Sequence, residues 1–302
     1  MKKLNFQRVS SHFPCPVCGR TKYCSYTEDF VICTRQYSFK QTKLGHYIHN
    51  WHEIGESPPP VPEKRGTARR EDSHLDRVYR RLLSLLELEA GHRKQLLSRR
   101  LSPEGYRSLP KGSRSWICSR FDAEEMHGVP GFGKKKDGSW TLTGPPGLIA
   151  PVVSPEGLIV ALNIRVDERR EDGKYRLLSS SWLENGANPG ARFHLAGRDK
   201  KGPLWITEGQ LKADAASDFL NCPVLAVQGI ASWQGAEDLQ MGNTAVVAYD
   251  CEDNFETRKH ENNLIRALKN SGWRVFKAYW QKNKGLDDAL VEGEEIFTGR
   301  VF

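Results

Sequence analysis

Residues 202–302 alternate between strand-like and helix-like segments, and this alternation is the strongest constraint on the fold. The apolar strand segments are PLWITEG, PVLAVQG, TAVVAYD and WRVFKAYW. Between them lie segments of helical character, QLKADAASDFL, SWQGAEDLQ and ETRKHENNLIRALKNSG. Strands that alternate with helices form a mostly parallel sheet covered on both faces. We therefore predict an α/β domain over residues 202–302.

The preceding region, residues 73–201, predicts helices followed by an antiparallel meander. Apolar residues from Leu75 to Leu86 recur at helical spacing, and Asp72 or Ser73 is a candidate cap. The stretch GHRKQLLSRRLSPEGYRSL predicts two further short helices with a break at Pro103. The runs GLIAPVV, GLIVALNIRVD and KYRLLSS, separated by glycine and proline, predict the strands of the meander.

The chain begins with a cysteine-containing module, residues 1–54, which the sequence GESPPPVPEKRGTARRED, residues 55–72, separates from the rest as a linker. Four cysteines lie close together in it, at Cys15, Cys18, Cys24 and Cys33. A C-x-x-C turn supplies two ligands of a tetrahedral zinc site, and two further cysteines complete it. We predict a structural zinc ribbon.

The spacing of these cysteines is also compatible with three alternatives. The first alternative is four incidental buried thiols, and the second is a redox C-x-x-C pair. The third is a zinc site in which His46, His49 or His52 replaces Cys24. Basic and aromatic residues are interleaved in the same module, a composition that suits single-stranded nucleic acid through phosphate attraction and base stacking.

Positive charge is concentrated in the first part of the chain. Residues 1–120 hold 23 Lys and Arg against 11 Asp and Glu, whereas residues 121–302 hold 22 against 26, and the whole chain has a net charge of +8. A basic front suggests binding of a polyanion, and a solvated basic surface is the alternative. For Lys134, Lys135 and Lys136, a solvated β-turn is as good an interpretation as contact with nucleic acid or nucleotide phosphates. The candidate nucleotide- or nucleic-acid-binding residues are Arg93, Lys94, Arg99, Arg100, Lys134 and Lys135.

Acidic residues follow two of the predicted parallel strands. Glu208 ends the first strand, and Asp250 and Glu252 follow the third with two-residue spacing that places them on one face. Asp287 or Asp288 follows the fourth strand. Ligands of open α/β sheets lie beyond the carboxyl ends of the strands, and clustered carboxylates suit Mg²⁺ or Mn²⁺. The alternative is that these are loop and cap acids, with Asp253 or Asn254 as the N-cap of the next helix.

Nothing in the sequence predicts a membrane protein. No apolar run approaches the ~18 residues of a membrane span, and the N-terminus has no continuous apolar segment typical of a signal peptide. We expect a cytoplasmic location, where the cysteines are not paired in disulfides.

Taken together, the ITEG, AYDCED and KGLDD segments resemble the Toprim domain of bacterial-type primases, topoisomerases and some nucleases. A four-ligand zinc module ahead of such a domain is similar to bacterial and phage primases. With YRSLP, GVPGF, KYRLLSS and TEGQLKADAA added, nearly the full chain resembles the primase-like proteins of plasmids, phages and integrated elements.

The resemblance implies roles for individual residues. Glu208 matches the Toprim glutamate, with general-base or metal-binding work, and Asp250 matches a metal-binding aspartate. Glu252 stands where the family has a second aspartate. Lys212 stands where primases often have another acid, and binding of a nucleotide phosphate is the role we expect for it. Asp287 matches the late acid of the metal site. Bacterial primases often have one histidine zinc ligand, so four cysteines are a variant.

The resemblance implies a primase that synthesises short RNA primers on single-stranded DNA from ribonucleoside triphosphates, with structural Zn²⁺ and catalytic Mg²⁺ or Mn²⁺. The sequence has no G-x-x-x-x-G-K-[ST] phosphate loop, so any replicative helicase would be a separate polypeptide. The alternatives are a Toprim-type metal-dependent nuclease and a non-catalytic DNA-binding or helicase-loading protein.

Overall fold

The chain forms two compact units, Met1–Glu63 and Lys64–Phe302. The computed structural model describes residues 6–10, 13–42, 45–58, 66–112, 114–170, 173–251 and 254–301. Part of the predicted linker, residues 59–65, therefore lies outside the described residues.

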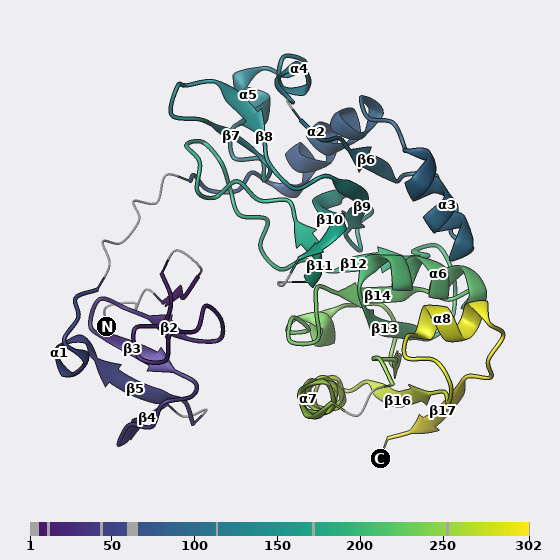
Figure 1. The fold of residues 1–302 in the computed structure, drawn as a ribbon. Helices are drawn as coiled ribbons and strands as arrows, with labels where there is room; N and C mark the ends of the chain where they lie inside the picture. Colours follow the sequence, from purple (N-terminus) through teal and green to yellow (C-terminus); the bar gives the residue numbers. More distant parts are fainter. Residues whose placement is uncertain are drawn as a thin grey trace. The chain divides into compact units, whose positions relative to one another are not determined.

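The first unit is an antiparallel sheet of short strands in the order β1-β2-β3-β5-β4 (Figure 1). Its elements are β1 (Gln7–Arg8), β2 (Ser25–Tyr26), β3 (Phe30–Cys33), β4 (Lys40–Gln41), β5 (Tyr47–Asn50) and the helical turn α1 (Trp51–Ile54). Apart from cysteines, the buried apolar residues of its core cluster are Val9, Tyr26, Val31 and Trp51. A core of this size needs a metal or another cross-link to be stable.

The second unit opens with helices that pack on a β-sheet. They are α2 (Asp72–Ser84), α3 (Ala90–Ser98), α4 (Ser115–Cys118) and α5 (Ala123–Met126). The predicted first helix is confirmed as α2, whose apolar face is buried in the core against residues of β10. Within that core the Tyr79 hydroxyl donates to the Pro130 carbonyl at 2.9 Å, which satisfies a polar group that burial would otherwise penalise.

The predicted antiparallel meander is confirmed as a sheet in the order β11-β10-β9-β6. Its strands are β6 (Arg107–Leu109), β9 (Gly147–Val153), β10 (Ile159–Arg170) and β11 (Gly173–Leu177), and a separate hairpin joins β7 (Phe132–Lys134) to β8 (Trp140–Leu142). The third helix predicted after Pro103 is wrong, because that segment becomes the edge strand β6, with Ser108 opposite Leu148. A short isolated helix is only marginally stable, so this segment pairs with the edge of the existing sheet instead.

The second sheet of this unit has the order β12-β14-β13-β15-β16-β17. Its strands are β12 (His194–Ala196), β13 (Leu204–Glu208), β14 (Val224–Val227), β15 (Thr244–Val247), β16 (Arg274–Tyr279) and β17 (Phe297–Arg300). The four inner strands are parallel, as predicted. The two edge strands are antiparallel, so the sheet is mixed, which the strand–helix alternation alone did not predict.

Helices cover both faces of the mixed sheet. Helices α6 (Gln210–Leu220) and α8 (Leu286–Val291) lie side by side over one face, and α7 (Phe255–Asn270) covers the other (Figure 1). The helix predicted in SWQGAEDLQ is reduced to one 3-10 turn, η1 (Ala236–Asp238), preceded by Gly235 with a φ of 93°. Of the helices in the described ranges, none has both the length and the apolar character needed to cross a membrane.

Candidate active site and metal centre

Two predicted acids meet at the carboxyl edge of the mixed sheet. Glu208 is the last residue of β13, and Asp250 lies three residues beyond the end of β15. The two strands are adjacent and parallel, so their carboxyl ends lie together. The backbone N–H of Asp250 donates to Glu208 Oε1 at 3.2 Å. Strand pairing thus places the acids in direct contact.

Lys212 lies between these two acids. It is on the first turn of α6, four residues after Glu208, so helix geometry turns its side chain back toward that residue. Its Nζ donates to Glu208 Oε1 at 3.0 Å and also bonds Asp250 Oδ1. The partners of Lys212 among the described residues are therefore two carboxylates, and binding of a nucleotide phosphate stays a prediction.

Neighbouring charges shift the pKa values of Glu208 and Lys212. Burial raises the pKa of Glu208 to about 7, and the Asp250 carboxylate adds to this while Lys212 opposes it. Burial lowers the pKa of Lys212, but the two carboxylates outweigh burial and hold that pKa above its ordinary value. Glu208 Oε2 is buried and has no hydrogen-bond partner among the described residues. One ammonium therefore does not fully compensate two acids.

The loop before α8 brings a third acid to the same place. The N–H of Cys251 donates to the Lys284 carbonyl at 2.9 Å, which ties this loop to the end of β15. Asp287 is buried there and pairs with Arg99 through Oδ2 and Nη1 at 2.6 Å. Burial raises the pKa of Asp287, and Arg99 opposes the shift. Arg99, predicted to bind nucleic acid, thus has a carboxylate partner.

A cleft of about 640 Å³ contains the acids and faces the antiparallel sheet. One wall is acidic, with Glu208 and Asp250 beside Asp287 and Asp288. Strands β10 and β11 contribute a second wall that sequence analysis missed; its residues are Arg165, Lys174, Tyr175 and Arg176. The only sequence signal for this wall is the cluster of basic residues in NIRVDERREDGKYRL, and nothing in the sequence brings it to the acids.

The other predicted basic residues do not line this cleft. Arg93, Lys94 and Arg100 are exposed on or just after α3, and the Arg100 guanidinium lies 5.9 Å from the centre of the Phe219 ring. Lys134 ends β7, with its ammonium 5.7 Å from the Trp140 ring centre, and Lys135 is exposed in the turn that follows.

Two predictions concern the segment after Asp250. Glu252, predicted as a catalytic and metal-binding residue, lies outside the described residues, as does Asp253. Asn254 is the N-cap of α7, and its Oδ1 accepts from the Glu256 N–H at 2.9 Å, which confirms one of the two predicted caps.

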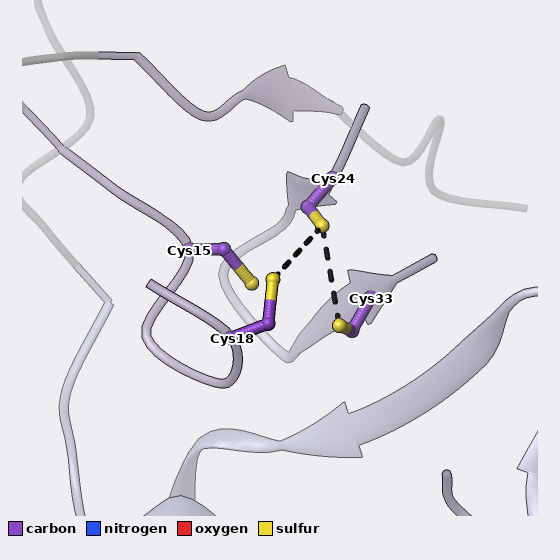
Figure 2. A group of neighbouring side chains, drawn as sticks. All are labelled: Cys15, Cys18, Cys24 and Cys33. Carbon is purple, nitrogen blue, oxygen red and sulfur yellow. Dashed lines mark hydrogen bonds between the residues drawn. The ribbon is translucent and has the colours of Figure 1, made fainter. Parts of the chain in front are cut away.

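The first unit brings its four predicted cysteines together (Figure 2). The sulfurs of Cys15, Cys18, Cys24 and Cys33 all lie within 4.8 Å of one another. Cys24 Sγ is 3.7 Å from Cys18 Sγ and 4.0 Å from Cys33 Sγ. A tetrahedral ion with Zn–S bonds of about 2.3 Å separates its sulfurs by about 3.8 Å. The cluster therefore has the ligand set and spacing of a structural zinc site.

Backbone N–H groups support this cluster. Gly19, with a φ of 69°, forms the tight turn between the cysteine pair and the rest of the knuckle, and its N–H donates to Cys15 O at 2.7 Å. The N–H groups of Arg35 and Gln36 donate to Cys33 Sγ at 3.4 and 3.3 Å. Such donors stabilise thiolates, the form that binds zinc.

The pKa values of the Cys15 and Cys18 thiols are shifted in opposite directions, and the contacts of His49 disfavour this histidine as a ligand. Burial raises the pKa of Cys15 to about 12. Burial acts the same way on Cys18, but the Arg20 N–H and the neighbouring thiols outweigh it and lower its pKa to about 7. His49 Nε2 bonds the Gln36 carbonyl at 3.1 Å instead of joining the cluster, which already contains Cys24.

Comparison with known proteins identifies the fold. No protein-family model and no curated protein sequence matches the chain. Among solved structures, the zinc-binding and RNA polymerase domains of the Aquifex aeolicus primase are 14% identical over 82% of this chain and 66% of that chain, with a TM-score of 0.58. The chain thus matches just under two thirds of that protein's length.

Two further structures show the same likeness. A DnaG primase catalytic domain bound to single-stranded DNA is 14% identical, over 74% of this chain and 80% of that chain, with a TM-score of 0.56. The RNA polymerase domain of Mycobacterium tuberculosis primase DnaG, in complex with double-stranded DNA, is 17% identical over 74% and 77%, with a TM-score of 0.57. At these identities the likeness shows a shared fold, and the predicted primase-like architecture is confirmed.

Proposed function

We propose that this chain is a DNA primase-like nucleotidyltransferase that makes short RNA primers on single-stranded DNA. The observation that carries the proposal is the cleft with an acidic wall, Glu208 and Asp250, facing a basic wall on β10 and β11. Nucleotidyl transfer needs both: carboxylates that hold a divalent ion and cations that hold a triphosphate. The fold shared with bacterial primases supports the same function.

The acidic wall fits Mg²⁺ or Mn²⁺. Glu208 Oε2 is buried without a hydrogen-bond partner among the described residues, and a hard cation would satisfy it. Asp250, Asp287 and Asp288 line the same cleft and would supply further oxygens. When bound, the ion would make a primer 3′-hydroxyl more acidic and stabilise the charge of the leaving pyrophosphate.

The basic wall would bind the incoming nucleotide. Arg165 of β10 lies opposite Tyr175 of the adjacent antiparallel strand β11, so these two side chains share a face of the sheet, and Lys174 and Arg176 line the same cleft. Their guanidinium and ammonium groups would contact the triphosphate and orient its α-phosphate toward the acids. Tyr175 lines the same cleft and offers a ring on which a base would stack.

The zinc unit would bind the template. Tyr23, Tyr37 and Phe39 are exposed by 77%, 63% and 94%, more than most aromatic side chains of this chain. The Arg35 guanidinium lies 5.7 Å from the centre of the Tyr23 ring, so a cation and an aromatic face are presented together. Single-stranded nucleic acid binds such surfaces through its bases and phosphates. The exposed Arg93, Lys94 and Arg100 would add backbone contacts in the second unit.

Primer synthesis on single-stranded DNA with labelled ribonucleoside triphosphates and Mg²⁺ or Mn²⁺ tests the proposal. We expect template-dependent oligonucleotides from the wild type and at least a 100-fold loss with Glu208→Gln, which removes a metal-binding oxygen. Glu124→Gln is the matched control, because Glu124 is an exposed residue of α5 that pairs with Arg70 outside the cleft. No product on any template with either metal would contradict the proposal.

Two further arms separate the alternatives. Incubation of DNA without nucleotides tests the nuclease: degradation that Glu208→Gln abolishes, without primer synthesis, would replace the primase by a Toprim-type nuclease. Binding of single-stranded DNA with neither synthesis nor degradation would leave a non-catalytic replication protein. A separate helicase partner would show itself as stimulation of primer synthesis when the helicase is added.

A further inference from the structure

A lysine occupies the space between two acids of the candidate metal site. Lys212 Nζ bonds Glu208 Oε1 at 3.0 Å and also bonds Asp250 Oδ1. The three side chains are shielded from water, with exposed fractions of 14% for Lys212, 16% for Glu208 and 18% for Asp250. The ammonium therefore stands where a divalent ion bridging the two acids would lie.

We propose that the Lys212 ammonium takes the place of one divalent ion, so that this site binds a single Mg²⁺ or Mn²⁺ and not a pair. The proposal rests on the metal-dependent function proposed above. Lys212 is in this view a positioning residue: its fixed positive charge holds Glu208 and Asp250 together and compensates one of the two carboxylates.

The geometry excludes an ion at the same position. Mg²⁺ binds oxygens at about 2.0–2.1 Å in an octahedral shell, so an ion bridging Glu208 Oε1 and Asp250 Oδ1 would overlap the Lys212 ammonium. Displacing that group by a short distance would leave two cations side by side in a poorly solvated cleft, where their repulsion is strong.

The lysine stem runs beside the loop before α8. A Cβ built on Gly285 would lie 3.6 Å from Lys212 Cε, an ordinary van der Waals separation, and 2.8 Å from Asp287 Oδ1. Lys212 itself lies on the first turn of α6. The glycine thus leaves room for both side chains at this edge of the cleft.

Among the described residues, the oxygens left over suit one ion. Glu208 Oε2 has no hydrogen-bond partner among the described residues, although it is buried. Asp288 is exposed and lines the same cleft, while Asp287 is already paired with Arg99. A single ion next to Glu208 Oε2 satisfies that oxygen and leaves the lysine bridge intact.

Counting Mn²⁺ ions by electron paramagnetic resonance on the zinc-loaded full chain tests the proposal. We expect one Mn²⁺ per wild-type chain, lost in Glu208→Gln. Lys212→Met keeps the length of the side chain without its charge, and we expect it to bind a second Mn²⁺. Lys200→Met is the matched control, since Lys200 pairs with Asp218 outside the cleft, and it should bind one.

Thermal unfolding gives a second readout. Without Mn²⁺, Lys212→Met leaves two adjacent carboxylates uncompensated, so its Tm should fall below that of the wild type, and Mn²⁺ should raise it by more than it raises the wild type. Lys212→Gln, which keeps a hydrogen-bond donor, serves as the second variant if Lys212→Met does not fold.

Three results would overturn the proposal: two Mn²⁺ ions in the wild type that Glu208→Gln removes, no Mn²⁺ in the wild type, or an unchanged count of one in both Lys212 variants. The count is independent of catalysis. The wild type could make no primer and still bind one Mn²⁺, with a second gained in Lys212→Met. That result would refute the primase function and support the proposal that the Lys212 ammonium replaces one ion.

Discussion

At Glu208, three influences act on one carboxylate. Burial is the largest and raises its pKa, Lys212 lowers it, and Asp250 raises it, with a result of about 7. Two acids share one ammonium, so one negative charge is left over. A proton removes that charge at low pH, and a divalent ion would remove it at neutral pH.

This imbalance predicts a pH dependence of stability. An acid whose pKa is higher in the folded state favours the folded state below its unfolded pKa of ~4.3, and that contribution is lost as pH rises toward 7. In the absence of Mg²⁺ and Mn²⁺, we expect Glu208→Gln to lose less stability than the wild type between pH 4.5 and 7, by up to about 3 kcal/mol.

Urea unfolding of the zinc-loaded chain across this pH range is the measurement. Glu124→Gln should follow the wild type, because that side chain is exposed. Parallel pH profiles for the wild type and Glu208→Gln would show that burial does not shift this carboxyl group.

The sequence predicted the site residues that follow the ends of parallel strands. It did not predict the site residues that only tertiary contacts bring to the cleft. Glu208 and Asp250 were found because parallel strands end at one edge. The bond between Lys212 and Glu208 was not predicted, because Glu208 ends strand β13 and Lys212 lies on helix α6. The basic wall, with Arg165, was not predicted either, because only the packing of one sheet against another brings it to the acids.

Helix α6 joins the two sheets of the second unit. The buried Gln210 Oε1 accepts from Asn163 Nδ2 of β10 at 2.8 Å. Asp214 accepts from His194 Nε2 at 2.9 Å and from the Tyr106 hydroxyl. The Val153 N–H donates to His194 Nδ1 at 3.0 Å, which leaves Nε2 to donate to Asp214. These bonds fix the acidic wall relative to the basic wall.

Removing Asp214 should therefore weaken the second unit. Asp214→Ala leaves two donors, on Tyr106 and His194, without an acceptor, and each such buried group costs about 1–3 kcal/mol. We expect a loss of about 2–4 kcal/mol in the free energy of unfolding, measured in urea. Asp218→Ala is the control: Asp218 is 62% exposed and should cost less than about 1 kcal/mol. Equal losses in the two variants would contradict the structural role of Asp214.

Elements with a strong local pattern were predicted, and weak ones were not. Helix α2 and the inner strands have long apolar patterns that local structure and tertiary packing both favour. The segment at Arg107–Leu109 and the turn at Ala236–Asp238 are short, and their conformation follows from neighbouring strands and from Gly235. Strand β12 was missed because three residues carry no periodic signal.

The whole molecule consists of two units with different sources of stability. The second unit has several buried apolar clusters, whereas the core cluster of the first contains three of its cysteines among seven buried residues. Metal binding to such a small unit is folding free energy. Residues 1–120, which include the first unit, hold 23 Lys and Arg against 11 Asp and Glu, a charge that suits the template binding proposed above.

Zinc removal should therefore unfold one unit and spare the other. We expect close to one zinc per chain by elemental analysis, lost in the double variant Cys15→Ser, Cys18→Ser and retained in Cys222→Ser. Limited proteolysis of the double variant should digest the first unit and leave a resistant fragment of the second. Unchanged zinc content, or digestion of both units together, would contradict the two-unit description.

Primer synthesis by the zinc-loaded wild type is the most direct test of the central claim, that the two-walled cleft joins nucleotides on a DNA template. We predict labelled oligonucleotides that require single-stranded DNA, ribonucleoside triphosphates and Mg²⁺ or Mn²⁺, and that fall at least 100-fold in Asp250→Asn. Product formation that survives Asp250→Asn and Glu208→Gln unchanged, or no product from the wild type under any of these conditions, would contradict it.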